Sequence, residues 1–210
     1  ISPSLSAALN TIEAPVHFLD FETFSPVIPL YAGTRAYQRI PFQWSCHHED
    51  DSGNLTHSAF LAKDMEDPRE ALALSLLETL GNRGSIVVYS PFEKSVIRSL
   101  ADTFPHLASR LLALNDRMVD LLQIIKAHYY HPAFHGSFSI KQVLPVLVPA
   151  LSYKELAITG GDVAPMEFQR MMGSQDAEER NSIYTNLLAY CAMDTLAMVE
   201  VLKVMKSKIV

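Results

Sequence analysis

Short apolar segments alternate with amphipathic stretches along the chain, which is the pattern of an α/β domain. The segment Val16–Thr23 is mostly apolar on both of its alternating faces, so it predicts a central strand covered on both sides. Two further strands are predicted at Ile40–His48 and Leu55–Leu61. The polar turn between them, Glu49–Asn54, favours an antiparallel hairpin.

Helical periodicity is more common after this hairpin. Asp67 and Pro68 predict the start of a helix that runs to about Leu80. A short strand is then predicted at Ile86–Tyr89, and Pro91 can start the helix that follows it. Further elements are predicted as a helix from about Pro105 to Leu114, a short strand or helix start at Met118–Leu122, a His- and aromatic-rich connection at His128–Phe138, and a helix at Ser139–Leu147.

The last element is the strongest helix. Apolar residues recur at steps of three and four from Ile183 to Met205, so this helix lays one long face on the core. Asp176 can cap its N-terminus, and Glu179 is expected to complete a reciprocal capping box. The order of elements predicts one α/β domain with a mixed sheet over residues 1–210, in which residues 1–14 form a tail.

Composition and charge narrow the functional classes. The 210 residues are 49% apolar and carry a net charge of −6, which argues against a tight, non-specific binder of duplex nucleic acid but leaves room for a local basic groove.

Cys46 and Cys191 are far apart, so we expect no disulfide framework and a cytoplasmic location. No apolar run approaches the roughly 20 residues of a membrane span, so no membrane partner is expected. Because the sequence does not begin with Met, we expect it to be a piece of a longer protein, whose N-terminal domain would be a partner.

Two acids interrupt the predicted central strand. Asp20 and Glu22 lie two residues apart, so their side chains leave the same face and stand next to each other. Adjacent carboxylates in an apolar strand repel and lose hydration unless a cation is present. A divalent ion such as Mg²⁺ or Mn²⁺ is the simplest remedy, because hard cations prefer carboxylate oxygens. The alternative is an edge strand with solvated acids, which a lone Asp-x-Glu would favour.

Two more acids lie where chemistry is expected. Asp194 falls within the apolar stripe of the last helix, and Tyr190 projects from the same face one turn earlier. The alternative for Asp194 is a structural acid satisfied by a lysine or a backbone amide. Glu93 follows the strand Ile86–Tyr89, near the strand end where α/β sheets usually gather their sites. The alternative for Glu93 is an acid that merely complements the helix dipole.

Three segments together resemble the motifs of the DEDD 3′-5′ exonucleases of the ribonuclease H-like superfamily. They are His-Phe-Leu-Asp-Phe-Glu-Thr around Asp20, Val-Val-Tyr-Ser-Pro-Phe-Glu-Lys around Glu93, and Tyr-Cys-Ala-Met-Asp-Thr from Tyr190 onward. The second motif of that family usually reads Asn-x-x-Phe-Asp, so Tyr89 stands in place of Asn and Glu93 in place of Asp. A Tyr four residues before the last Asp is typical of the Tyr branch of that family.

A closer resemblance is carried by Pro41–Ser45, by the segment His135–Pro145 and by the ending Tyr190–Met198. These segments resemble a bacterial family described as a domain of unknown function, which is assigned to the same superfamily and often ends larger proteins. The resemblance extends from about residue 16 to residue 206. It implies a ribonuclease H-like α/β fold whose mixed five-stranded sheet has the order 3-2-1-4-5, with strand 2 antiparallel and helices on its flanks.

The resemblance also implies a chemistry. Asp20, Glu22, Glu93 and Asp194 would hold two divalent ions, Mg²⁺ or Mn²⁺, which clamp the attacking and leaving oxygens of a phosphodiester. Tyr190 would orient the attacking water. The partner would be nucleic acid, most simply a single-stranded 3′ end. Residues expected to support the site or contact the substrate are Asp120, Phe24, Lys94, His135 and Lys141, with Arg35, Arg39, Arg98, Trp44 and Phe138 as further candidates for phosphates and bases. For most of the aromatic residues among them, packing in the core is the favoured alternative.

Two other clusters of potential ligands are interpreted as structural. The histidines His128, His131 and His135 have a spacing that suggests zinc, but Pro132 breaks the helix that would align them. A phosphate contact from His135 is the more plausible role in this loop. The tripeptide Cys46–His48 alternates along a strand, so its neighbouring side chains point to opposite faces, and it is interpreted as structure.

Three functions remain open on the sequence. The first is a metal-dependent exonuclease that acts on DNA or RNA ends. The second is an inactive ribonuclease H-like module that binds nucleic acid or a protein, which Tyr89, Glu93 and the acidic net charge favour. The polar groups of the first and third motifs argue against it, because a non-catalytic domain has no physical reason to gather them at one point. The third is a hydrolase of short oligonucleotides or another small phosphodiester.

Overall fold

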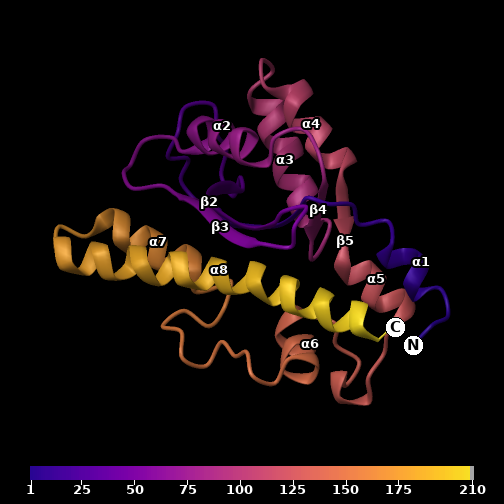
Figure 1. The fold of residues 1–210 in the computed structure, drawn as a ribbon. Coiled ribbons are helices and arrows are strands. Elements are labelled where there is room, and N and C mark those ends of the chain that lie inside the picture. Colours follow the sequence, from indigo (N-terminus) through magenta and orange to yellow (C-terminus); the bar gives the residue numbers. More distant parts are fainter. Residues whose placement is uncertain (209–210) are drawn as a thin grey trace.

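The computed structural model describes residues 1–208, in which helices cover both faces of a mixed five-stranded sheet (Figure 1). The strands are β1 (Val16–Phe24), β2 (Ile40–Glu49), β3 (Leu55–Leu61), β4 (Ser85–Val88) and β5 (Met118–Asp120). The helices are α1 (Leu5–Leu9), α2 (Arg69–Leu80), α3 (Phe92–Thr103), α4 (Ala108–Asp116), α5 (Leu121–His128), the 3₁₀ helix η1 (Pro132–Phe134), α6 (Ile140–Leu147), α7 (Ala164–Gly173) and α8 (Ala177–Ser207).

The sheet has the order β3-β2-β1-β4-β5, which confirms the expected arrangement. Strand β2 runs antiparallel to both β1 and β3, and their pairing forms a meander. Strands β1, β4 and β5 are parallel, so helices must return the chain between them. Helix α2 lies between β3 and β4 in the chain, and α3 and α4 lie between β4 and β5. As a result, β1 lies in the middle of the sheet with both faces covered.

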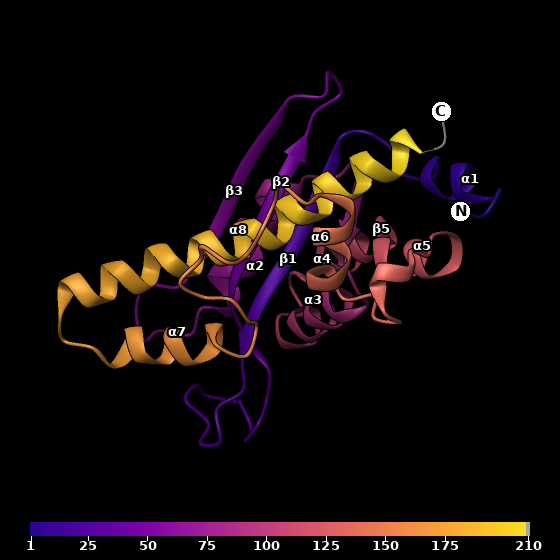
Figure 2. The same cartoon turned by 90° about the horizontal axis from the view of Figure 1, so that it is seen from below.

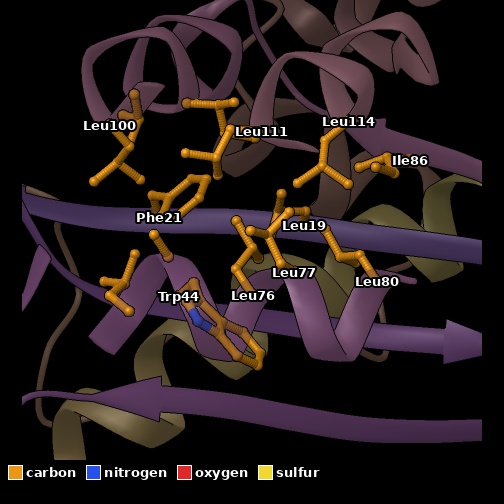
Figure 3. Close-up of a cluster of buried hydrophobic side chains, with 14 of the residues drawn as sticks. Leu19, Phe21, Trp44, Leu76, Leu77, Leu80, Ile86, Leu100, Leu111 and Leu114 are labelled. Carbon is orange, nitrogen blue, oxygen red and sulfur yellow. The ribbon is translucent and has the colours of Figure 1, made fainter. Parts of the chain in front are cut away.

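One face of the sheet packs against α2, α3 and α4. Alternate residues of β1, namely Leu19 and Phe21, point to this side, and Trp44 of β2 joins them (Figure 3). The leucines of α2 fill the space beneath, with Leu76 fully buried. Burial of this many large side chains is the main favourable contribution to folding on this side of the domain.

The opposite face is crossed by α8, which passes over β1 and β2 (Figure 2). The N-terminal part of α8 packs with α7 around Phe42 and Phe168, whose rings stack with centroids 4.0 Å apart. Its C-terminal part packs with α1, α5 and α6 around Phe18 and Phe134. Among residues 1–208, no helix combines the length and the apolar character that a membrane crossing requires.

The structure confirms the predicted strands and most predicted helices, with small shifts at their ends. Helix α7 is missed by the sequence pattern because only Ala164, Phe168 and Met171 of its ten residues are buried. Helix α5 is longer than the predicted helix start at this position, and it includes His128 from the expected connection.

The capping prediction for α8 is half right. The Asp176 carboxylate accepts hydrogen bonds from the backbone amides of Glu178 and Glu179, at 2.9 and 3.4 Å. The Glu179 side chain does not complete the box. It accepts instead from the Ser174 hydroxyl and from the Arg170 guanidinium. The amide of Asp176 is satisfied by the Ser174 hydroxyl at 3.1 Å, which removes the need for the reciprocal bond.

Part of the segment expected as an N-terminal tail is packed onto the domain. Leu5 and Leu9, one turn apart in α1, are buried in the cluster that α5 and the end of α8 form. The backbone amide of Ser2 donates to the carbonyl of His128 at 2.8 Å, which adds a second attachment. Two leucines at helical spacing are enough to bury one face of so short a helix.

Helix α2 offers a matched test of the core. Replacing the fully buried Leu76 with alanine should lower the free energy of unfolding by about 2–5 kcal/mol, since it removes apolar contacts and leaves a cavity. Leu74, on the same helix, is 46% exposed, so Leu74→Ala should change it by about 0.5 kcal/mol. Urea denaturation followed by circular dichroism would measure both, and equal effects would contradict this description of the core.

Candidate metal centre

The site begins on β1, where Asp20 and Glu22 leave the face that α8 covers. Their neighbours on that face, Phe18 and Phe24, are buried in the clusters beneath α8, so the two carboxyl groups lie between apolar layers. Glu22 is 7% exposed, and Asp20 is partly buried. The prediction that these two acids share a face is therefore confirmed.

The third acid comes from the end of the neighbouring parallel strand. Because β1 and β4 are parallel, the residues that follow β4 lie beside the C-terminal half of β1. Pro91 precedes the first turn of α3, which carries Glu93 inward until only 3% of it is exposed. The Ser90 hydroxyl donates to Glu93 Oε2 at 3.3 Å and so holds this carboxyl group in place.

The fourth acid comes from α8. Tyr190 and Asp194 lie one turn apart on the helix face that meets β1 and β2. The helix is held to β2 by three polar contacts. Thr195 Oγ1 lies 3.0 Å from Ser45 Oγ and 2.8 Å from His47 Nδ1, and Gln43 Nε2 donates to the Leu187 carbonyl at 2.9 Å. These bonds set the position of Asp194 along β1.

All four acids line one cleft of about 590 Å³. Tyr190 lines the same cleft, as do Arg39 from the loop before β2 and Lys141 from α6. The structure therefore brings together the four acids and the tyrosine that sequence motifs single out, although they come from β1, α3 and α8.

The charges in this cleft are unbalanced. Burial, and then the neighbouring Asp194, Glu22 and Glu93, raises the pKa of Asp20 well above its usual range. Burial and the charge of Asp194 raise the pKa of Glu22 to about 8, although Lys141 opposes this shift. Burial raises the pKa of Glu93 to about 7. Burial also raises the pKa of Asp194, against the hydrogen bond from Tyr153. These shifts show that the carboxylates, when ionised, lack enough positive charge nearby.

Three residues that motif reasoning does not assign to the site contact the acids directly. The Tyr153 hydroxyl donates to Asp194 Oδ1 at 2.6 Å. The Cys191 thiol donates to Asp20 Oδ2 at 3.6 Å. Ser90 holds Glu93. Tyr153 lies between α6 and α7, in a segment without helix or strand, so the sequence carries no periodic signal that could have revealed its role.

Lys141 has several partners at the edge of the cleft. Its Nζ donates to the Thr159 carbonyl at 2.7 Å and to the Tyr190 hydroxyl at 3.1 Å. It also lies 5.3 Å from the ring centroid of Tyr153 and 5.1 Å from that of Tyr190. The expectation that Lys141 supports the site agrees with this placement.

The donor set fits hard divalent cations. Four carboxyl groups offer up to eight oxygen atoms, which are the ligands that Mg²⁺ and Mn²⁺ prefer. Oxygen atoms of Asp20 and Glu22 lie, together with the Cys191 sulfur, within 4.8 Å of one another. Divalent ions bound here would place positive charge beside the buried acids and so oppose the rise of their pKa values.

Several other predicted residues lie elsewhere. Phe24 is 2% exposed and packs on Phe42 and Phe168, and Trp44 is 1% exposed in the opposite core, so neither can stack on a base. Asp120 does not line the cleft. Its carboxylate caps α5 through the amide of Gln123 at 3.1 Å, and its charge adds to the raised pKa of Glu93, whose main cause is burial.

The remaining residues expected to contact the substrate lie at the rim of the cleft or outside the cleft. Lys94 and Arg98 line a separate hollow along α3. Arg39 lines both the cleft and a larger hollow of about 830 Å³, to which Arg35 also contributes. His135, at the end of η1, is exposed and does not line the cleft. Phe138, a candidate for stacking on a base, also lies outside the cleft lining and packs with Tyr130 and Phe134.

Tyr89, which stands in the place of the usual Asn of the second motif, has a structural contact. Its hydroxyl donates to the Phe138 carbonyl at 2.9 Å, which ties the segment before α6 to the end of β4. The ring lines the cleft beside Glu93.

Comparison with known proteins adds one result. The family model described as "Domain of unknown function (DUF2779)" matches residues 17–139. The chain belongs to this family. The part of the DUF2779 domain that the family model matches contains Asp20, Glu22 and Glu93, and the residues from Lys141 to Asp194 lie beyond it. Neither the curated proteins nor the solved structures contain a significant match to the chain.

The raised pKa values predict that the metal-free DUF2779 domain loses stability as pH increases from about 7 to 8.5. Folded Glu22 and Glu93 retain protons in this window, with pKa values of about 8 and 7, whereas the unfolded chain has released them. The free energy of unfolding should fall by about 1 kcal/mol, which urea denaturation at a series of pH values would measure. The buried histidines oppose part of this fall, because folded His17 and His47, with pKa values of about 4, are neutral whereas the unfolded chain still binds some protons on them near pH 7.

Glu22→Gln should flatten this dependence, because the amide does not titrate. Glu78→Gln, on the exposed side of α2, removes the same charge and should leave the slope unchanged. A domain whose stability rises over the same window would contradict the assignment of raised pKa values to the four acids.

Proposed function

We propose that this domain is a divalent-metal-dependent nuclease of the ribonuclease H-like superfamily, which hydrolyses phosphodiester bonds at DNA or RNA ends in the 3′-5′ direction. The observation that carries the proposal is the convergence of Asp20, Glu22, Glu93 and Asp194 in one cleft from three separate elements. Burial of four acids is unfavourable in the absence of a cation, so their convergence points to metal binding. The sheet order 3-2-1-4-5, with β2 antiparallel, supports the superfamily assignment.

The four carboxyl groups would hold two Mg²⁺ or Mn²⁺ ions. Such a pair stabilises the charge that develops on the attacking and leaving oxygens, and it lowers the pKa of a bound water. The length of Glu93, compared with the Asp usual in this motif, is compatible with the site because the first turn of α3 already carries its carboxyl group into the cleft.

Tyr190 would act as a hydrogen-bond donor in the reaction. Burial, and then Asp194, Glu22 and Asp20, raises the pKa of its phenol above the ordinary value, so the hydroxyl keeps its proton at neutral pH. Lys141 donates to the oxygen of this hydroxyl at 3.1 Å, which leaves the phenol hydrogen for Asp194 or for a molecule in the cleft. Tyr190 would therefore orient a water or a phosphate oxygen rather than accept its proton.

Tyr153 would position Asp194. Its hydroxyl donates to Asp194 Oδ1 at 2.6 Å. This bond would fix the orientation of the carboxylate and leave Oδ2 available to a metal ion. Partners of this kind control the orientation of ligating carboxylates and influence metal affinity.

The substrate would be a single-stranded end. The net charge of −6 disfavours binding over a broad surface, so the phosphates must be met locally. Arg39 lines both the cleft and the adjoining hollow, where Arg35 also lies, and these residues offer a short basic path to the acids. The two free cysteines fit a reducing cytoplasm.

Cleavage of a 5′-labelled single strand in the presence of Mn²⁺ tests the activity. The wild-type domain should shorten the strand stepwise from its 3′ end, and Asp194→Asn or Asp20→Asn should reduce the rate by at least about 100-fold while the fold is kept. Removal of a buried charge should leave the melting temperature equal or higher in the absence of metal. EDTA should abolish activity of the wild type.

Glu78→Gln provides the control for loss of one negative charge, and it should retain full activity. Binding of the strand without cleavage, with Mn²⁺ present and Asp194→Asn indistinguishable from wild type, would favour the inactive binding module instead. Two departures from the usual second motif would then explain the loss of nuclease activity. Tyr89 stands in place of Asn and contacts Phe138, and Glu93 is longer than the usual Asp.

The positioning role of Tyr153 gives a separate prediction. Tyr153→Phe removes the bond to Asp194 and keeps the ring, so the affinity for Mn²⁺ should fall by about 10- to 100-fold with little change in melting temperature of the metal-free protein. Tyr130→Phe, at a position 57% exposed, is the matched control. Isothermal titration with Mn²⁺ would measure both, and equal affinities would exclude this role.

A further inference from the structure

A second group of potential ligands lies on the face of the sheet opposite the four acids. It consists of His17 from β1 and Cys46 and His48 from β2. The pairing register places His17 opposite His48 and Leu19 opposite Cys46, so all three side chains project to the same face as Leu19. Figure 3 shows Leu19 on the face where α2 packs. His47 lies between them in sequence but points toward α8.

The three donor atoms converge. The Nδ1 atoms of His17 and His48 are 2.7 Å apart, and Cys46 Sγ lies 3.9 Å from His48 Nδ1. All three atoms lie within 4.8 Å of one another. His17 is 6% exposed and Cys46 is fully buried, whereas His48 is only partly buried and gives access from solvent.

The hydrogen bonds determine where the protons are. His17 Nε2 lies 3.3 Å from the Arg83 carbonyl, which can only accept, so His17 carries its proton on Nε2. Its Nδ1 is therefore a free lone pair, and the contact of 2.7 Å requires His48 to donate from its own Nδ1. A histidine whose remote N–H is bound to a backbone carbonyl has the orientation typical of a metal ligand.

From this arrangement we propose that His17, Cys46 and His48 form a binding site for a thiophilic divalent cation, Zn²⁺, separate from the carboxylate centre. Imidazole nitrogen and thiolate sulfur are both zinc ligands, and a site with three protein ligands holds a water in the fourth position. On binding, the Cys46 thiol releases its proton to solvent, and the His48 proton moves from Nδ1 to Nε2. No oxidation or reduction is involved.

The dimensions agree with such an ion. Zn–N bonds of about 2.0–2.1 Å and Zn–S bonds of about 2.3 Å require tetrahedral N···N and N···S separations of about 3.3 and 3.6 Å. The separations of 2.7 and 3.9 Å lie on either side of these values, so small side-chain movements would complete the site.

The ion would join three segments at one end of the sheet. His17 lies near the start of β1, Cys46 and His48 lie in the second half of β2, and Arg83 belongs to the turn between α2 and β4. A bound Zn²⁺ would hold β1 to β2, and through His17 it would hold this turn. The site would stabilise the fold and would not take part in phosphodiester hydrolysis.

Cobalt(II) is a direct probe, because a thiolate ligand produces an intense sulfur-to-cobalt charge-transfer band in the near ultraviolet. The reduced, metal-free domain titrated with Co²⁺ should develop this band with one ion per chain, and Zn²⁺ should displace it whereas excess Mg²⁺ should not. Cys46→Ala should abolish the band. His48→Ala, at the partly exposed ligand, should weaken Co²⁺ binding at least about tenfold.

Two variants separate this site from the carboxylate centre. Cys191→Ala removes the thiol beside Asp20, and Asp194→Asn disrupts the carboxylate centre; both should keep the band. A circular dichroism spectrum of each variant shows that it is folded. The proposal is wrong if the folded wild type gives no band, if Cys46→Ala retains it, or if Cys191→Ala loses it. None of these outcomes depends on nuclease activity.

Discussion

Electrostatic repulsion among four carboxyl groups is the constraint around which this domain is arranged. Asp20 and Glu22 lie in the centre of the sheet, and packing of α3 and α8 brings Glu93 and Asp194 to the same cleft. The apolar layers on both sides supply the free energy that holds these groups together. The raised pKa values reflect the burial of these groups first and their mutual repulsion second.

Helix α8 is the element on which this arrangement depends most. Its apolar residues alone would allow it to slide or rotate on the sheet, because hydrophobic contact has little directional preference. The bonds from Ser45 and His47 to Thr195, and from Gln43 to the Leu187 carbonyl, remove that freedom. Buried polar groups lose free energy when they lack partners, so these bonds favour one position of α8 on the sheet. Asp194 directly precedes Thr195 in α8 and is fixed by the same contacts.

Much of the fold and part of the site could be predicted from the sequence. The spacing of Asp20 and Glu22 places them on one face of a strand, and the four-residue step from Tyr190 to Asp194 places them on one face of a helix. These are local consequences of strand and helix geometry. That the acids from the two elements share one cleft follows from packing, and the sequence suggested it only through the resemblance to known motifs.

The rest depends on relations between distant segments. Tyr153 belongs to a segment without periodicity, so only the folded chain brings it to Asp194. Phe24 and Trp44 are candidates for base stacking or for the core on the sequence, and the structure places both in the core, because aromatic composition alone does not distinguish the two kinds of position. The tripeptide Cys46–His48 is correctly predicted to alternate between faces, yet the ligand set requires His17, which only the β1–β2 register brings to it.

The cleft is built from two kinds of structure, and this division affects how the domain can vary. The acids lie on β1, α3 and α8, whose positions are set by the core, whereas Tyr153 and the Thr159 carbonyl that holds Lys141 belong to the segment between α6 and α7. A connecting segment of this kind tolerates changes in length and composition far better than a strand or helix does. The opening of the cleft can therefore be remodelled, and with it the range of molecules admitted, while the arrangement of carboxyl groups is inherited unchanged.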